Sequence, residues 1–376
     1  MPAKTPFTQP TIGDRERDYV LEALESRELA GNGRFTKACQ SLLEQKTGAA
    51  KVILTHSATG ALDMMPLVLD MEPGDEVIVP SFTFVSTANA FALRGVVPVF
   101  VDVRADTLNL DETLIEGALT GRTRAVVPVH YAGVACEMDT IMEIARRHGL
   151  AVLEDAAQGI GSTYKGKPLG SFGELSALSF HATKNITAGE GGALLINEPA
   201  LIERAEIAAE KGTNRSLFVR GEVDKYTWVD LGSSFMPGEM SAALLLAQLE
   251  QENEINDRRR MLWERYHHAL MPLEQRGLVH RPTVPAGCVH NGHIYYLMFT
   301  DGEAQQRARN ALVAAGFNAS SHYGALHNSP AARRFGRAEG RFAVTEHIAT
   351  SLLRLPLFAH METGVVDRVS EILLQL

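Results

Sequence analysis

The chain is poor in cysteine. Its 376 residues include only Cys39, Cys136 and Cys288, which lie far apart in the sequence. This spacing provides neither a disulfide framework nor the closely spaced ligands of a structural zinc site. We therefore expect no bound metal, and a reducing compartment such as the cytoplasm is the simplest setting.

Long hydrophobic runs are missing as well. The longest stretch without a charged residue, residues 77–93, contains several hydroxyl and amide side chains, which make it too polar to span a membrane. Residues 1–6 lack the apolar core of a signal peptide. We expect a cytoplasmic protein that does not enter a membrane.

Basic residues are in the minority. Lysine and arginine number 36 against 45 aspartates and glutamates, which gives a net charge of −9. An acidic surface repels phosphate backbones, so nucleic-acid binding is disfavoured, although a local basic pocket for one small anion is compatible with this charge. The hydrophobic fraction of 45% is that of an ordinary globular protein.

Several familiar catalytic motifs are absent. No Gly-x-Gly-x-x-Gly follows the first predicted strand, and the chain has no Walker loop, His-Glu-x-x-His or Gly-x-Ser-x-Gly. A dinucleotide site, a P-loop, a zinc-protease site and a nucleophile elbow are therefore unsupported.

Short apolar runs alternate with helical patterns through the first two-thirds of the chain. Strands are predicted at residues 51–54, 76–79, 97–103, 125–129, 151–154, 177–180 and 193–196. Helices are predicted at residues 58–69, 86–94, 138–148 and 199–211. This alternation predicts an α/β fold of βαβ units with a mostly parallel sheet.

The pattern changes near residue 240. The sequence predicts two long helices, at residues 240–255 and 257–270, then a strand at 293–299 and a helix at 303–315. We therefore predict a large α/β domain over residues 1–250 and a smaller α+β domain over residues 251–376.

Lys184 and Asp155 are the first candidates for chemistry. Lys184 follows the strand at 177–180, and it is either a solvated loop residue or a lysine in an apolar cleft. In an apolar cleft, desolvation would lower the pKa of the lysine, and the neutral amine could attack an aldehyde. Asp155 ends the strand at 151–154 and is either a helix cap or a ligand-crevice carboxylate. Together they suit pyridoxal phosphate, which needs a lysine for its aldehyde and a carboxylate for its ring nitrogen.

Small hydroxyl residues follow the first strand. Ser57 or Thr59 is either a plain helix N-cap or part of a phosphate-binding site. The two interpretations are compatible, because an N-cap and a bound phosphate use the same backbone N–H groups. Ser179 adds a hydroxyl beside Lys184. Phe82 and Phe84, after the second strand, either stack on a flat cofactor ring or belong to the core.

Four segments together resemble a known family. Residues 55–60, 80–87, 154–158 and 179–192, in this order, resemble the DegT/DnrJ/StrS family of sugar-nucleotide aminotransferases, and the resemblance covers nearly the whole chain. It implies pyridoxal phosphate bound on the aspartate-aminotransferase fold (fold type I), in a homodimer with active sites at the subunit interface.

The resemblance also implies roles for single residues. Lys184 would form the Schiff base, Asp155 would pair with the pyridinium nitrogen, and Gln158 would lie near the ring hydroxyl. The phosphate and the ring face would be held by Ala58, Thr59, Ser179 and Phe84, with Ala58 standing where the family often has glycine.

Two further segments, residues 129–139 and 211–234, are similar to dTDP-4-keto-6-deoxyglucose C-4 transaminases. The similarity implies this dTDP-sugar as substrate, L-glutamate as amino donor, and a product of galacto or gluco configuration. The residues it adds as substrate-binding candidates are Arg215, Arg220, Lys225, Tyr226 and His322. The three basic residues either bind a diphosphate or belong to a solvated charged loop, which would be the ordinary interpretation without the similarity. Ser234 stands where the family's asparagine reaches the partner's cofactor phosphate.

The same residues are compatible with two other functions and argue against two more. A C-3 sugar-nucleotide aminotransferase and a non-enzymatic regulator that binds the cofactor both use this fold. Related deoxysugar dehydratases carry histidine in place of the lysine, so the presence of Lys184 argues against them. A NAD-dependent sugar oxidoreductase lacks support because the glycine fingerprint is absent.

Overall fold

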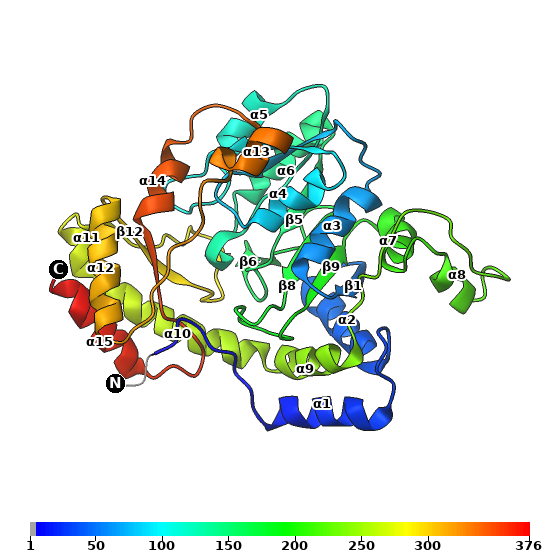
Figure 1. The fold of residues 1–376 in the computed structure, drawn as a ribbon, viewed down its shortest axis with the longest axis horizontal. Coiled ribbons are helices and arrows are strands. Elements are labelled where there is room, and N and C mark those ends of the chain that lie inside the picture. Colours follow the sequence, from blue (N-terminus) through cyan, green and yellow to red (C-terminus); the bar gives the residue numbers. More distant parts are fainter. Residues whose placement is uncertain (1–4) are drawn as a thin grey trace.

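A computed structural model describes residues 5–376, and an eight-stranded sheet lies at its centre (Figure 1). The strands, in spatial order, are β1 (Lys51–Thr55), β9 (Gly192–Ile196), β8 (Leu175–Ser179), β5 (Ala151–Asp155), β4 (Thr123–Val126), β2 (Glu76–Pro80), β3 (Val97–Val101) and β13 (Arg337–Ala338). β9 runs antiparallel to both of its neighbours, β1 and β8, and the other seven strands of this sheet run in one direction. The predicted mostly parallel sheet is confirmed.

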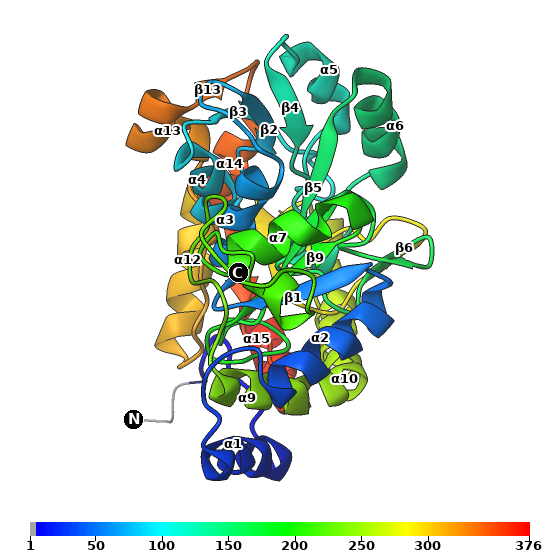
Figure 2. The same cartoon turned by 90° about the vertical axis from the view of Figure 1, so that its right-hand side faces the viewer.

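Helices cover both faces of this sheet (Figure 2). Successive side chains of a strand point to opposite faces. Val77 and Val79 of β2 therefore pack in one core with α3 (Ala58–Val68), α4 (Val85–Ala92) and α7 (Ile202–Ala209). Ile78, between them, packs on the other side in the core that includes α6 (Met138–His148). Burial on both faces is why these strands are almost entirely apolar.

The predicted helix at residues 240–255 is wrong in its bounds. The structure has α9 (Glu239–Glu250) and α10 (Glu252–Ala269), which meet at Gln251. Contacts with the N-terminal helices hold this break. Gln251 Nε2 donates to Glu16 Oε1 at 2.7 Å, and Glu252 pairs with Lys46 at 2.9 Å. The partners lie more than 200 residues away, so the sequence of this region alone did not reveal the break.

A second, antiparallel sheet lies in the C-terminal part of the chain. It consists of β10 (Val279–His280), β12 (Tyr295–Phe299) and β14 (Leu352–Leu355). It shares a core with α10, α12 (Gly302–Ala314) and α15 (Thr363–Leu374). Residues 337–338, however, form β13 and extend the large sheet beside β3. The domain boundary at residue 250 stays a prediction.

The remaining elements connect these layers. The helices are α1 (Asp14–Ser26), α2 (Arg34–Thr47), α5 (Ile115–Ala118), α8 (Arg215–Val219), α11 (Met271–Gln275), α13 (Pro330–Phe335) and α14 (Ala343–Ser351). A small third sheet contains β11 (Cys288–Val289), β6 (Thr163–Tyr164) and β7 (Lys167–Pro168). Across residues 5–376, none of the helices combines the length and the apolar character needed to cross a bilayer.

Candidate active site

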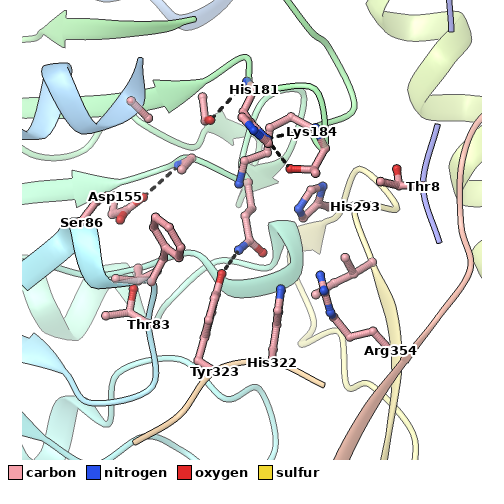
Figure 3. A pocket seen from close by; sticks show the side chains of 18 of the residues that line it. Thr8, Thr83, Ser86, Asp155, His181, Lys184, His293, His322, Tyr323 and Arg354 are labelled. Atoms are coloured by element: carbon pink, nitrogen blue, oxygen red, sulfur yellow. Dashed lines mark hydrogen bonds between the residues drawn. The ribbon is translucent and has the colours of Figure 1, made fainter. Parts of the chain in front are cut away.

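A cavity of about 650 Å³ lies at the carboxyl ends of the parallel strands, the usual ligand crevice of such a sheet. Its volume is in the range of small-molecule sites. The segments after β1, β2, β5 and β8 form one wall, and β14 with residues 321–324 forms part of the opposite wall (Figure 3). The predicted residues that line this cavity are Ala58, Thr59, Phe84, Asp155, Gln158, Ser179, Lys184 and His322.

Lys184 reaches the cavity from the turn after β8. Its backbone N–H donates to the carbonyl of His181 at 2.9 Å, which fixes the turn. Burial lowers the pKa of Lys184 to about 8; Asp155 opposes this shift, and Arg354 adds to it. With a pKa of about 8, roughly a tenth of the side chain is the neutral, nucleophilic amine at pH 7, far more than for an exposed lysine.

Asp155 is held by a short chain of hydrogen bonds. Its side chain is 5% exposed, Thr87 Oγ1 donates to Oδ2 at 2.7 Å, and the Ala157 N–H donates to Oδ1 at 3.1 Å. Thr87 and Thr83 share a further hydrogen bond of 2.9 Å between their hydroxyls. These donors to both oxygens fix the orientation of the carboxylate toward the cavity.

Gln158 is oriented from two sides. Its Oε1 accepts from the Ala132 N–H at 2.7 Å, and its Nε2 donates to the Tyr323 hydroxyl at 3.1 Å. These partners determine which end of the amide is oxygen. The side chain therefore links the segment after β5 to the opposite wall of the cavity.

The N-terminus of α3 lines the cavity next to β9. Ser57 is the N-cap, and its Oγ accepts from the Gly60 N–H at 3.0 Å. The first turn has no acidic residue. A Cβ at Gly192 would approach the Ala58 nitrogen to 2.4 Å, so β9 passes the helix start at a distance that only glycine allows. Free N–H groups at a helix start, beside the Ser179 hydroxyl, can hold a phosphate.

The two phenylalanines after β2 differ in burial. Phe82 is 1% exposed and belongs to the core, whereas Phe84 is 55% exposed and lines the cavity. Phe84 lies 6.3 Å from the Tyr323 ring, measured between centroids. The cofactor-stacking hypothesis therefore applies to Phe84 alone.

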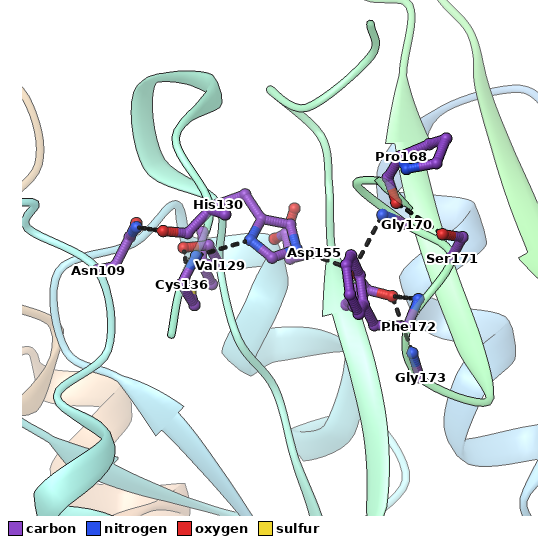
Figure 4. Close-up of polar contacts among 12 residues, drawn as sticks. Asn109, Val129, His130, Cys136, Asp155, Pro168, Gly170, Ser171, Phe172 and Gly173 are labelled. Atoms are coloured by element: carbon purple, nitrogen blue, oxygen red, sulfur yellow. Dashed lines mark hydrogen bonds and ion pairs between the residues drawn. The ribbon is translucent and has the colours of Figure 1, made fainter. Parts of the chain in front are cut away.

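His130 and Glu154 form a fully buried pair next to Asp155. Figure 4 shows His130 beside the strand that carries Asp155. His130 Nε2 lies 2.9 Å from Glu154 Oε2, and the His130 N–H donates to the Asp155 carbonyl at 3.1 Å. Burial alone would raise the pKa of Glu154, but His130 and the N–H groups of Gly173 and Gly170 hold that pKa below its usual range. The pair fixes the segment at 129–136 to the end of β5.

Uncharged polar groups line the opposite wall. His322 Nδ1 lies 3.1 Å from the Tyr131 hydroxyl, and its ring stacks on Tyr323 at 4.1 Å between centroids. Burial, with Arg354 and Lys184 nearby, lowers the pKa of His322 to about 2. Burial also lowers the pKa of His293 well below its usual value. Both imidazoles are therefore neutral at physiological pH.

Five predicted residues do not reach this cavity: Arg215, Arg220, Lys225, Tyr226 and Ser234. They lie on or beside the loop that carries α8, which projects away from the body of the chain (Figure 1). Arg215 pairs with Glu210 at 3.1 Å, and Arg220 pairs with Glu206 and Glu222 at 2.7 Å each. Within one chain, these residues are therefore a separate surface.

Comparison with known proteins decides the family. A sequence profile of the DegT/DnrJ/EryC1/StrS aminotransferase family matches residues 10–374. The chain belongs to this family. It is accordingly a pyridoxal-phosphate-dependent aminotransferase.

Solved structures agree over nearly the whole chain. The aminotransferase TlmJ from Streptoalloteichus hindustanus is 30% identical, with a TM-score of 0.90 over 99% of this chain and 98% of its own. The PLP form of Spr1654 from Streptococcus pneumoniae is 26% identical, with a TM-score of 0.89 over 98% and 97%. Also similar is 3-amino-5-hydroxybenzoic acid synthase, which is 27% identical, with a TM-score of 0.89 over 99% and 98%.

The cavity suits the family's cofactor. It presents a partly buried lysine with a lowered pKa, a carboxylate with both oxygens held, and a helix start free of acidic side chains. These groups match the aldehyde, the ring nitrogen and the phosphate of pyridoxal phosphate. Sequence reasoning missed His293 and Arg354, which also line the cavity. Both lie more than 100 residues from Lys184 in the sequence. Only the chemical type of each side chain, an imidazole and a guanidinium, could have pointed to a place in the site.

Proposed function

We propose that the protein transfers an amino group from L-glutamate to C-4 of dTDP-4-keto-6-deoxyglucose, giving a dTDP-4-amino-4,6-dideoxyhexose. The observation that carries the chemistry is that Lys184 and Asp155 line one cavity. The substrate half of the proposal is supported by the similarity of residues 129–139 and 211–234 to C-4 transaminases. The known relatives differ in product, as the name of 3-amino-5-hydroxybenzoic acid synthase shows, so the family alone does not determine the substrate.

Each residue has a defined task in this proposal. When bound, pyridoxal phosphate supplies an aldehyde and an electron sink. Asp155 holds a proton on the ring nitrogen, and Thr87 keeps that carboxylate in place. Lys184 holds the cofactor and, once released, its amine takes and returns a proton at the reacting carbon, for which a pKa of about 8 is well placed.

The far wall of the cavity supports a sugar substrate. His322 and Tyr323 are neutral, because burial lowers the pKa of the histidine to about 2 and raises that of the tyrosine to about 12. Neutral imidazole and phenol groups can both donate to and accept from hydroxyl groups. They can therefore form hydrogen bonds with the hydroxyl groups of an uncharged sugar ring.

The basic loop supports a dimer. Because Arg215, Arg220 and Lys225 lie outside their own cavity, we propose that they bind the diphosphate in the site of a partner subunit. The same loop exposes Val219 and Trp228, which are 71% and 74% exposed in the single chain. Exposed apolar side chains of this size are typical of an interface. Sedimentation at micromolar concentration should show a dimer, and a fully active monomer would contradict this part of the proposal.

The test of the reaction is a product analysis. The protein, loaded with pyridoxal phosphate, is incubated with L-glutamate and dTDP-4-keto-6-deoxyglucose, and the product is examined by proton NMR. The proposal predicts an amine on C-4. A large coupling between the C-3 and C-4 protons identifies the gluco product, and a small coupling identifies the galacto product. An amine on C-3, or reaction only with a UDP- or GDP-sugar, refutes the substrate half.

A further inference from the structure

His293 lines the active-site cavity, but the roles proposed above do not use it. It lies just before β12, and its side chain is 5% exposed. Its backbone is held on both sides, because the N–H donates to Asn291 Oδ1 at 3.0 Å and the carbonyl accepts from Arg259 at 2.6 Å. The ring nitrogen Nδ1 lies 2.9 Å from Asn185 Oδ1. These three contacts fix the position of the imidazole.

Asn185 decides which ring nitrogen of His293 carries the proton. Its Nδ2 donates to the carbonyl of Asn291 at 2.9 Å and to Asn256 Oδ1 at 2.8 Å. A carbonyl only accepts, so the other end of this amide, which faces His293, is the oxygen. That oxygen accepts from the Nδ1–H group, and Nε2 of the neutral ring is therefore an acceptor. Asn185 also follows Lys184 directly in the chain, so the same contact ties the ring to the turn that carries the lysine.

The charges around His293 keep the ring neutral. Burial and, next in size, the positive charge of Lys184 lower the pKa of His293 well below its usual value. Arg259, Arg354 and His322 act in the same direction. Because the influence of a charge falls with distance, the lysine is the cation that the ring meets most strongly. Nε2 is therefore a fixed, uncharged acceptor.

The structure gives Nε2 no hydrogen-bond partner within residues 5–376. A polar group in a cavity wall is completed by a group that reaches it from the cavity. The Tyr323 hydroxyl is already engaged by Gln158, and the guanidinium of Arg354 lies over an aromatic ring. Lys184, in contrast, combines a flexible side chain with rotatable N–H donors. In Figure 3, His293 and Lys184 lie together in the upper part of the cavity.

We propose that His293 is a positioning residue whose Nε2 accepts a hydrogen bond from Lys184 Nζ whenever that amine is free of the cofactor. The inference rests on the role proposed above for Lys184 and not on the choice of sugar. With one N–H group donated to Nε2, the lone pair of the amine points away from the ring and into the cavity, where it takes and returns the proton. Nε2 itself neither gains nor loses a proton.

Two substitutions separate the acceptor from the contact that fixes the ring. Asparagine matches the Nδ1 side of histidine, so His293→Asn can still donate to Asn185 but has no acceptor at the position of Nε2. Glutamine matches the Nε2 side, so His293→Gln keeps an acceptor in the cavity and loses the contact with Asn185. His290→Asn is the matched control, because His290 is also buried but packs against Trp263, 4.4 Å between ring centroids, rather than lining the cavity.

The test measures the basicity of Lys184 without turnover. Each protein is loaded with pyridoxamine phosphate, the amino form of the cofactor, which leaves Lys184 free. The loaded protein is treated briefly with acetic anhydride over a range of pH, and acetylation of Lys184 is followed by mass spectrometry of the digest. Only the neutral amine reacts, so the midpoint of the pH profile reports the pKa of Lys184, and the plateau at high pH reports its accessibility.

A hydrogen bond from the Lys184 ammonium group to Nε2 stabilises the charged form and holds its pKa up. We therefore expect His293→Asn to lower the midpoint, so that its rate at pH 7, relative to its own plateau, is about three- to tenfold above that of wild type. His293→Gln and His290→Asn should keep the wild-type midpoint.

An unchanged or raised midpoint in His293→Asn, or a lowered midpoint in His293→Gln, overturns the inference. Borohydride reduction of the wild-type protein loaded with pyridoxal phosphate distinguishes this failure from a failure of the proposed function. A label on Lys184 leaves the role of the lysine standing, whereas a label on a different lysine overturns both.

Discussion

Replacing Glu154 by glutamine should strongly destabilise the protein. Both oxygens of this buried carboxylate accept hydrogen bonds. Oε1 accepts from the N–H groups of Phe172 and Gly173 at 2.6 and 2.9 Å. Oε2 accepts from the Gly170 N–H at 2.9 Å and lies 2.9 Å from His130 Nε2. The Cys136 N–H donates to His130 Nδ1 at 3.2 Å, so Nε2 carries the ring proton and all four partners of Glu154 are donors. A carboxylate, whose two oxygens only accept, satisfies all of them.

The expected loss follows from this geometry. Glutamine keeps one oxygen, and its NH2 group would face two donors, so two hydrogen bonds to a charged acceptor disappear. Each hydrogen bond to a charged acceptor is worth about 1.5–3 kcal/mol, so the loss of two costs about 3–6 kcal/mol. We expect Glu154→Gln to lower the free energy of unfolding by about 3–6 kcal/mol near neutral pH.

The effect should depend on pH in one direction. The pKa of Glu154 is lowered in the folded protein from the ordinary value of 4.5. The folded state therefore binds this proton less readily than the unfolded state does. The stabilisation from Glu154 is fully present above pH 4.5 and is lost as the pH falls through the folded-state pKa. The difference between wild type and Glu154→Gln should therefore shrink below pH 4.5.

Urea unfolding followed by circular dichroism at pH 7, 5 and 4 measures this difference. Glu143→Gln is the matched control, because Glu143 forms an exposed pair with Arg147 and exposed pairs contribute little. If Glu154→Gln is no less stable than Glu143→Gln at pH 7, the reasoning about the buried carboxylate is refuted. A difference that grows toward pH 4 would refute the assigned direction of the pKa shift.

Three substitutions in or next to the cavity should have distinct effects. Asp155→Ala should leave the cofactor attached to Lys184 but slow turnover severely, and near wild-type turnover would show that another carboxylate serves the ring nitrogen. Thr87→Val should slow turnover by about 10- to 100-fold, because one of two donors to Asp155 is lost, and Thr87→Ser should restore it. Gly192→Ala should weaken cofactor binding in a spectroscopic titration, because its Cβ would meet the Ala58 nitrogen at 2.4 Å; unchanged affinity would exclude a tight phosphate cup there.

Local signals in the sequence predicted much of the large sheet. The helix over residues 138–148 is confirmed to the residue, because an amphipathic pattern ends in basic residues and then Gly149, which adopts φ 65°. The strand before Asp155 is likewise a short apolar run bounded by polar residues. Such features depend on neighbours in the chain, which a single sequence shows.

Features that depend on distant contacts were not predicted. The break at Gln251 depends on Glu16, and α1 and α2 were not identified at all. The sequence did not single out Arg354, because only the pairing of β14 with β12 brings it opposite Asp155. The sequence offers a charged residue in an otherwise apolar strand, and the fold determines what that charge faces.

The most direct test of the account is the identity of the lysine that holds the cofactor. The protein is saturated with pyridoxal phosphate, reduced with borohydride, digested, and mapped by mass spectrometry. The account predicts that the label is on Lys184, and that Lys184→Ala takes up no reducible cofactor while keeping the wild-type circular dichroism spectrum. A label on any other lysine, or undiminished labelling of Lys184→Ala, would contradict the central claim.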